Sequence, residues 1–362
     1  MSDLDSTKAS KRLISLDAYR GAVMITLISH GFGFTAFKGH SFLDFLARHT
    51  DHVEWEGCGY WDLIMPAFMF VVGVAMPFAY EKRRSIGQTY GTILRHVIQR
   101  AIVLVLLAAL FTSIHRGQPV LTFINVLPQI AFGYFFAFFL LNRSYATQGI
   151  TAVLILIVYT IVWAVYPGNG EGGPWAMGNE NMGSDFDKWL MGAYYSGYYV
   201  ASSAIPETAT IIAGIMCGRL VASNLSQKRV MTILAISTVA CMAAGLALTP
   251  VVPMIKRIWT ASFAIYSTGW CILFLLLFYW IVEVVGYRRW TFIFVVVGMN
   301  SIAAYMIFQL LRGWIDKAVL TFTRPLVEAM GAYGQVFQDV LVLALIWYVL
   351  YFFYKNKIFF KV

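Results

Sequence analysis

One run of side chains stands out as suited to acid–base chemistry. It begins at His52 and continues through Glu54, Trp55 and Asp62 into an apolar segment. An imidazole here could take a proton from an attacking amine or hydroxyl, or accept an acyl group itself. Asp62 or Glu54 would orient the ring and stabilise its charged form, and Trp55 would wall the site. The alternative interpretation is a solvated loop histidine.

Two other histidines offer rival chemistry. His30 lies toward the far end of the first apolar segment, where an ionisable group is a functional candidate by default. His49 precedes His52 by three residues, beside Asp51 and Glu54, and the pair could serve a metal-dependent hydrolase. Two histidines without a third fixed ligand are a weak metal signal. We therefore expect no metal.

Polar residues at the other end of the apolar segments could bind a ligand. Asp17 and Arg20 are one helical turn apart and can form an ion pair, although a guanidinium also holds phosphate well. Arg95 and Arg100 lie at the start of another apolar segment. Asn300 falls near the middle of a third, where a buried amide needs partners. It would bind substrate, or it would join helices.

The composition indicates what must position these residues. Of the 362 residues, 59% are hydrophobic and only 12% are charged, about half the usual charged share. A soluble domain could not cover itself with so few polar groups, so we expect an all-α polytopic membrane protein. Because a bilayer core requires about 20 apolar residues per helix, the sequence predicts ten spans: Leu16–Phe37, Tyr60–Tyr80, His96–Ile114, Val120–Leu141, Gly149–Tyr166, Ala204–Val221, Val230–Leu248, Trp259–Val282, Trp290–Leu311 and Val336–Tyr354.

The distribution of charge predicts the orientation. Most of the 27 Lys and Arg residues fall in the N-terminal segment 1–14, in alternate short loops and at the C-terminus. Positive loops stay in the cytoplasm, so both termini should be cytoplasmic. The net charge of +9 then reflects topology, and we expect no nucleic-acid partner. The stretches 38–59, 167–203 and 312–335 become extracytoplasmic loops of a single transmembrane domain.

The middle extracytoplasmic loop is rich in aromatic residues. Such rings can stack on sugars, and they can equally form the aromatic belt found at membrane interfaces. The rings in question are Trp175, Trp189, Tyr194, Tyr195, Tyr198 and Tyr199. The four cysteines provide no disulfide framework, because three of them lie in apolar segments.

Several motifs together resemble one family. They are Ser-Leu-Asp-Ala-Tyr-Arg-Gly at 15–21, His-x-x-Trp-x-Gly at 52–57, Asp-Leu at 62–63 followed by Pro66, Phe68, Phe70 and Gly73, Gly-Met-Asn-Ser at 298–301, and Lys-Ile-Phe-Phe-Lys-Val at 357–362. In this order they resemble the heparan-α-glucosaminide N-acetyltransferase family and its bacterial relatives. The eukaryotic member has an additional luminal segment and one more span, neither of which we expect in this chain.

The resemblance implies transmembrane acetyl transfer in a bacterial inner membrane. Acetyl-CoA would bind from the cytoplasm, where Arg20, Arg95 and Arg100 would meet its phosphates, and the acetyl group would pass to an extracytoplasmic amino sugar or glycan. The active histidine of the family falls on His52. An asparagine of the family near the end of the first span has no match here, because His30 and Gly31 occupy that place. Relatives suggest a homodimer.

Two other functions remain open from the sequence. Bacterial polysaccharide O-acyltransferases are similar in the first span and have a functional histidine near the position of His30. A secondary transporter for a sugar or an amphiphile is compatible with ten spans. However, transporters often contain internal repeats, and the run from His52 to Gly73 is not repeated in the second half of the chain.

Overall fold

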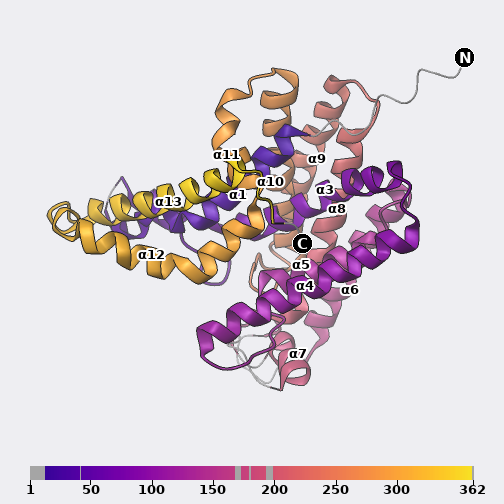
Figure 1. Ribbon diagram of the computed structural model, residues 1–362. Coiled ribbons are helices and arrows are strands. Elements are labelled where there is room, and N and C mark those ends of the chain that lie inside the picture. Colours follow the sequence, from indigo (N-terminus) through magenta and orange to yellow (C-terminus); the bar gives the residue numbers. More distant parts are fainter. Residues whose placement is uncertain (1–12, 41, 168–172, 179–180, 193–198, 361–362) are drawn as a thin grey trace, which may run out of the picture. The chain divides into compact units, whose positions relative to one another are not determined.

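The computed structural model describes residues 13–360 apart from 41, 168–172, 179–180 and 193–198 (Figure 1). Residues 1–12 of the expected cytoplasmic segment, and the candidate sugar-stacking residues Tyr194, Tyr195 and Tyr198, lie outside the described residues. The described chain is helical. Its extended pairing consists of one isolated antiparallel bridge between Glu56 and Ile255.

The expected helical membrane class is confirmed. Seven helices are long and apolar enough to cross a bilayer, and an eighth crossing arises if a bent pair forms one span. The bent pair is Arg289–Gly298 with Ser301–Ala329, which meet at 64°. These segments account for eight of the ten predicted spans. The first and fourth predicted spans contain shorter helices.

The chain divides into two compact units. Among the described residues, unit 1 comprises residue 13, residues 55–57 and residues 65–276, and unit 2 comprises residues 14–54, 58–64 and 277–360. The helices of unit 1 are α3 (Ile64–Ser85, from Met65), α4 (Tyr90–Arg116), α5 (Val126–Phe138), α6 (Tyr145–Val165), α7 (Met182–Met191), α8 (Ala204–Ala222), α9 (Gln227–Leu248) and most of α10 (Ala261–Tyr279). The helices of unit 2 are α1 (Ile14–Ile28), α2 (Asp44–His49), α11 (Phe292–Gly298), α12 (Ser301–Ala329) and α13 (Ala332–Lys355).

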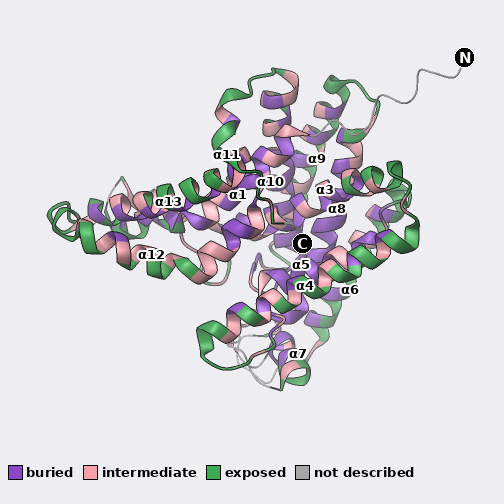
Figure 2. Ribbon diagram, in the orientation of Figure 1, coloured by how far each residue is buried: buried purple, intermediate pink, exposed green. Residues whose placement is uncertain are grey.

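Within unit 1, α8 is the central helix. It packs against α5, α6 and α9, and most of its residues are buried (Figure 2). By contrast, α4, α6 and α9 leave large aliphatic side chains exposed, among them Leu106, Ile157 and Val239. Apolar residues on an outer face suit contact with lipid chains. The buried polar residues of α8, including Glu207, therefore lie on the helix that lipid reaches least.

Within unit 2, α1 packs on α11 at very short range. A Cβ added at Gly298 would lie 2.0 Å from the Asp17 carbonyl oxygen, and one at Gly21 would lie 1.8 Å from that of Phe294. Only glycine permits two backbones to approach so closely. The two glycines come from opposite ends of the chain, and both belong to the motifs noted in the sequence.

The prediction that residues 312–335 form a loop is wrong. Helix α12 continues to Ala329 and α13 begins at Ala332, so the two form a helical hairpin with a two-residue turn. The charged residues that lower the hydropathy of this stretch are partly satisfied inside the hairpin, where Arg312 pairs with Asp339 and Gln338 donates to Asp316. The charged residues of this stretch therefore indicate side-chain pairs between two helices and not a loop.

Two predicted spans are shorter as helices than expected. In the first, α1 ends at Ile28, because the chain then turns through four consecutive left-handed residues, His30 to Gly33. In the fourth, α5 begins only at Val126, where the side chain of Asn125 accepts a hydrogen bond from the amide of Leu127 and caps the helix. The segment 38–59 is mostly irregular, as expected, and contains the short helix α2.

Candidate functional site

His52 and Asp62 are brought together in unit 2. Nδ1 of His52 lies 2.7 Å from Oδ1 of Asp62. His52 follows α2 in an irregular segment, and Asp62 lies in the single turn Trp61–Leu63 that leads into α3. The Asp62 side chain is 1% exposed and that of His52 is 32% exposed. A buried carboxylate thus supports an imidazole that solvent reaches.

Backbone amides hold the Asp62 carboxylate in place. Oδ2 accepts hydrogen bonds from the amides of Val53, at 3.2 Å, and Gly59, at 3.0 Å. The chain between His52 and Asp62 therefore folds back over the carboxylate that orients the imidazole. These amides also help to compensate the burial of a negative charge.

The other flank of His52 is held by Asp51. Oδ1 of Asp51 accepts the His52 amide at 2.7 Å, and Oδ2 accepts the Lys38 ammonium at 2.5 Å. Burial would by itself raise the pKa of Asp51, but these hydrogen bonds outweigh that effect and hold the pKa below its ordinary value. Asp51 is therefore a carboxylate at neutral pH, and it anchors the backbone at the position of His52.

The pair has the geometry of a base and its orienting group. A carboxylate at Nδ1 favours the tautomer with the proton on Nδ1 and the lone pair on Nε2. When Nε2 takes up a proton, the buried carboxylate stabilises the resulting imidazolium. The arrangement can therefore remove a proton from an amine or a hydroxyl that approaches Nε2.

Glu54 and Trp55, the other two residues predicted at the site of His52, fall in different units. Glu54 is exposed and belongs to unit 2, whereas Trp55 belongs to unit 1. Nε1 of Trp55 donates to the carbonyl oxygen of Trp175 at 2.8 Å, and its ring packs against a buried cluster containing Tyr159 and Trp163. Trp55 thus joins an aromatic cluster that includes Trp175 from the long loop.

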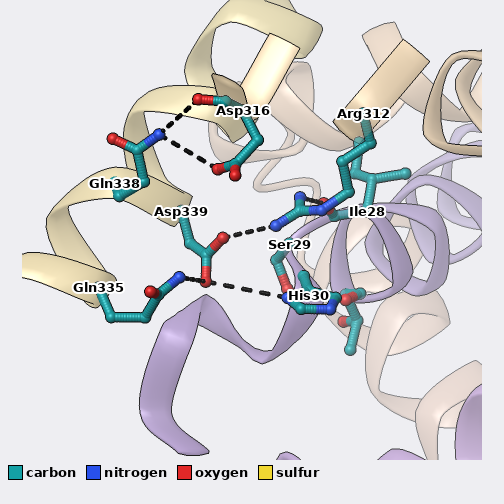
Figure 3. A network of polar contacts seen from close by, with 9 residues as sticks. Ile28, Ser29, His30, Arg312, Asp316, Gln335, Gln338 and Asp339 are labelled. Atoms are coloured by element: carbon teal, nitrogen blue, oxygen red, sulfur yellow. Dashed lines mark hydrogen bonds and ion pairs between the residues drawn. The ribbon is translucent and has the colours of Figure 1, made fainter. Parts of the chain in front are cut away.

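His30, the rival catalytic residue, lies beside a buried ion pair in unit 2 (Figure 3). Its Nδ1 is 4.0 Å from Oδ2 of Asp339, and its side chain is 64% exposed. Asp339 also pairs with Arg312 at 2.5 Å and accepts a hydrogen bond from Gln335. Arg312 in turn donates to the carbonyl oxygen of Ile28, at the end of α1.

The predicted phosphate-binding arginines have different surroundings. Arg20 is clamped in unit 2, since it donates to Asp17 at 2.7 Å and to the carbonyl oxygen of Gly298 at 2.8 Å. In unit 1, Arg95 is exposed on α4, while the Arg100 guanidinium lies 4.8 Å from the centre of the Tyr134 ring. The ion pair between Asp17 and Arg20 that the spacing suggested is present.

Asn300 binds the C-terminal segment of the chain. Its amide nitrogen donates to the carbonyl oxygen of Ile358 at 2.9 Å, and its amide oxygen accepts from the Phe360 amide at 3.1 Å. The residue is fully buried. This geometry agrees with the structural alternative, and it joins two motifs, 298–301 and 357–362, that are far apart in the sequence.

The donor set of the metal alternative is incomplete among the residues the structure describes. No three His, Cys, Asp or Glu side chains there are grouped closely enough to hold an ion. The His49 ring instead contacts the Phe45 ring at a tilted angle of 56°, with ring centres 4.4 Å apart.

Sequence reasoning missed two sets of polar residues. The first set is the ion pair of Arg312, in a predicted loop, with Asp339, in a predicted apolar span. The two residues are 27 positions apart, so their spacing gives no indication that they pair. In unit 1, Glu207 and Gln129 both bind Ser203 and are buried. A glutamate inside an otherwise apolar span was the signal available for this second set.

A family model described as a domain of unknown function (DUF5009) is similar to residues 12–168 of this chain. That region contains His30, His52, Asp62, Arg95 and Arg100. No curated protein matches the chain.

Proposed function

We propose that the protein is a transmembrane acyltransferase that moves an acetyl group from cytoplasmic acetyl-CoA to an extracytoplasmic amino sugar or glycan. The observation that carries this proposal is the contact of 2.7 Å between Nδ1 of His52 and the buried Asp62 carboxylate. The resemblance described from the sequence supports the choice of donor and acceptor. The proposed setting is a bacterial inner membrane, with ten crossings, both termini in the cytoplasm and assembly as a homodimer.

The chemical step exchanges a thioester for an amide. The acceptor nitrogen attacks the acetyl carbonyl carbon and the carbon–sulfur bond breaks. Nε2 of His52 takes the proton that the nitrogen loses, and the CoA thiolate that leaves takes up a proton in turn. Asp62 stabilises the imidazolium in between, and the site contributes further by orienting the two substrates. In the two-step form of the same chemistry, Nε2 itself carries the acetyl group before the acceptor arrives.

The basic residues predicted for the cytoplasmic side would serve the donor. CoA carries several phosphate charges, which arginine binds well. Arg95 and Arg100 on α4 are the candidates in unit 1, and Arg20 is the candidate in unit 2. Because Arg20 already holds Asp17 and Gly298, its part in the proposal is to position α1 as well as to meet phosphate.

The test is acetyl transfer by purified protein in lipid nanodiscs, with labelled acetyl-CoA and a panel of amino sugars. His52→Ala should lower the turnover of glucosamine acetylation by at least about 100-fold, because general acid–base catalysis contributes about 10²–10⁴. His40→Ala is the matched control, since His40 is an exposed histidine of the same unit. Wild-type turnover in His52→Ala would refute the assignment of His52.

The position of His30 favours a second candidate, O-acyl transfer to a polysaccharide hydroxyl. A histidine 4.0 Å from a buried aspartate could also act as a base once it moves closer. Loss of transfer in His30→Ala, with transfer retained in His52→Ala, would support this candidate over the first.

A further inference from the structure

Helix α7 and its N-terminal cap have their polar side chains inside the protein and large apolar side chains outside. Asn181, Ser184 and Asp187 are at most 4% exposed. Trp189 is 77% exposed and Leu190 is 40% exposed. An amphipathic helix on the surface of a water-soluble protein has the opposite arrangement, because burial favours apolar side chains. The outer side of α7 therefore indicates an apolar partner.

Hydrogen bonds within unit 1 hold the polar side of α7 in place. The Asn181 side chain caps the helix, since its Oδ1 accepts the Ser184 amide at 3.0 Å and its Nδ2 donates to the carbonyl oxygen of Gly178 at 2.9 Å. Oδ1 of Asp187 accepts the Ala201 amide at 2.8 Å. Because buried polar groups lose stability when such bonds break, α7 cannot readily turn its apolar side inward.

The apolar side chains of α7 share one side of the helix. Met182, Phe186, Trp189 and Leu190 follow one another at helical spacing. Met182 packs against the buried cluster that contains Trp163. Further along, the rings of Phe186 and Trp189 contact each other, with centres 5.6 Å apart. The second half of α7 thus presents a continuous apolar surface on the outside of unit 1.

Helix α7 is bonded to the end of a helix that is long and apolar enough to cross the membrane. That helix, α6, ends at Val165, and the hydroxyl of the next residue, Tyr166, donates to Oδ2 of Asp185 in α7 at 2.5 Å (Figure 1). Ile161 and Val165 are 54% and 71% exposed, so the outer face of α6 stays apolar to its last turn. Helix α7 is therefore held at the depth where α6 leaves the hydrocarbon core.

The area of this apolar surface favours lipid over a second copy of the chain. Helix α7 has ten residues, so it is about 15 Å long. Three large side chains on it offer at most a few hundred Å², whereas a stable protein interface buries about 800 Å² on each partner. Tryptophan is also typical of the headgroup level of a bilayer, because the indole is apolar apart from its N–H group.

We infer that α7 is an interfacial helix, inserted into the phospholipid headgroup region through Phe186, Trp189 and Leu190. Its polar side faces unit 1 and fastens the surrounding loop to the protein, so the loop is held at the membrane surface. The insertion does not depend on acetyl transfer, and only its assignment to the outer leaflet rests on the proposed orientation. Of the two sequence interpretations of Trp189, this one selects the aromatic belt over stacking on a sugar.

The test is spin labelling of single cysteines in the full-length protein, without its four native cysteines, in nanodiscs of phosphatidylcholine and phosphatidylglycerol. Labels on Trp189→Cys and Leu190→Cys should collide more with oxygen, which dissolves in lipid, than with a water-soluble nickel chelate. Lys188→Cys is the matched control, because Lys188 is exposed and lies roughly 200° around the helix from Leu190. The ratio of oxygen to nickel collision rates should be at least about 10-fold higher at positions 189 and 190 than at 188.

Two results would overturn the inference. Equal ratios at the three positions, or preferential collision with nickel at 189 and 190, would place this side of α7 in water. Exclusion of both reagents there would show that protein covers it, and distances between labels on two copies would then identify a dimer interface. Where a label unfolds α7, Trp189→Phe provides the unlabelled test: brominated lipids should quench less of its fluorescence than of the wild type's, and equal quenching would contradict insertion.

Discussion

The Asp62 carboxylate distinguishes His52 from a histidine that only solvent surrounds. It selects the imidazole tautomer through Nδ1, and it is itself fixed by the amides of Val53 and Gly59. Three residues of one short segment are therefore ordered by a single carboxyl group. A substitution at Asp62 should disturb proton transfer more than it disturbs binding, because the negative charge matters most when the imidazole is protonated.

Asp62→Asn should accordingly lower the turnover of acetyl transfer by about 100-fold or more, with a small change in KM for the acceptor. The amide is isosteric, but it cannot supply the charge that stabilises the imidazolium. Steady-state kinetics with labelled acetyl-CoA measures both constants. An equal change in KM, with turnover intact, would assign Asp62 to substrate binding or to loop structure.

The ion pair between Arg312 and Asp339 is a structural element of unit 2. Both side chains are largely buried, at 11% and 1% exposure. Asp339→Asn should destabilise the protein by about 3–5 kcal/mol, because it leaves a buried guanidinium without its counter-charge. Thermal unfolding in nanodiscs measures the loss.

Two further variants test this explanation. The double variant Arg312→Met with Asp339→Leu should recover much of the stability, since it removes both charges together. Asp44→Asn, which breaks the exposed pair with Arg48, should change the unfolding temperature little. Equal effects of Asp339→Asn and Asp44→Asn would show that burial is not the cause.

The left-handed turn after α1 explains why the first span ends early. His30, Gly31, Phe32 and Gly33 all have positive φ, between 52° and 71°. The turn brings Gly33 against the backbone of Gln335 at the start of α13, where an added Cβ would lie 2.8 Å from the carbonyl carbon and oxygen. Left-handed backbone is unfavourable for residues with a Cβ, so packing against α13 must hold His30 and Phe32 in place.

Gly33→Ala should therefore destabilise unit 2 through two effects, an unfavourable φ and a clash with Gln335. Gly39→Ala is the matched control, because Gly39 also has positive φ but nothing lies within 4 Å of an added Cβ. We expect a loss of about 1–2 kcal/mol for Gly39→Ala and a clearly larger one for Gly33→Ala, measured by thermal unfolding. Similar losses for both variants would mean that the contact with Gln335 is not tight.

Helix α7 should be docked more firmly at acidic pH. Burial raises the pKa of Asp187 to about 6, and the hydrogen bond from the Ala201 amide offsets only part of that effect. A raised carboxyl pKa means that the folded form retains a proton that the unfolded form loses. The stabilisation is therefore full below the ordinary pKa of 3.8, and it is lost as the pH rises through 6.

Hydrogen exchange of α7 at pH 5 and pH 7.5, corrected for intrinsic rates, tests this expectation. Protection of the α7 amides should fall between the two values in the wild type and stay nearly constant in Asp187→Asn. Asp185→Asn, which alters the neighbouring carboxylate bonded to Tyr166, should retain the wild-type dependence. A pH response that survives in Asp187→Asn would assign it to another group.

The sequence predicted long apolar helices better than it predicted their ends and their partners. Hydropathy located α4, α6 and α9 because their outer faces are apolar along the whole length. It missed the continuation of α12 because Arg312 and Asp316 look like loop residues until α13 supplies Asp339 and Gln338. It also could not foresee the left-handed turn, which depends on contacts with α13, more than 300 residues away.

For the candidate site, the sequence predicted contacts between residues that are close in the chain and not those between distant residues. His52 and Asp62 are close in sequence, so their types and spacing sufficed to suggest a pair, and the structure brings them together. The amide of Asn300, in contrast, binds backbone groups of Ile358 and Phe360, 58 and 60 residues away. The polar cluster of Glu207 and Gln129 joins two helices through Ser203, and only the folded arrangement brings these side chains together.

The number of membrane crossings decides on which side of the membrane each site lies. Seven or eight segments are long and apolar enough to cross, and our proposal of ten crossings adds α1 and α5, with 15 and 13 residues. A helix of 13 residues is about 20 Å long, shorter than the hydrocarbon core of about 30 Å. For α5 to cross, the segments on either side of it must complete the passage.

Labelling of single cysteines tests whether α5 crosses. In a background without the four native cysteines, Gly117→Cys precedes α5 and Asn142→Cys follows it, and both positions are exposed. If α5 crosses, a membrane-impermeant thiol reagent should label Gly117→Cys in intact cells and Asn142→Cys only in inverted vesicles. Gly87→Cys, in the short connection between α3 and α4, is the cytoplasmic control. Labelling of positions 117 and 142 from the same side would show that α5 does not cross the membrane. The proposed orientation of α6, and the proposed side of the loop that follows it, would then be wrong as well.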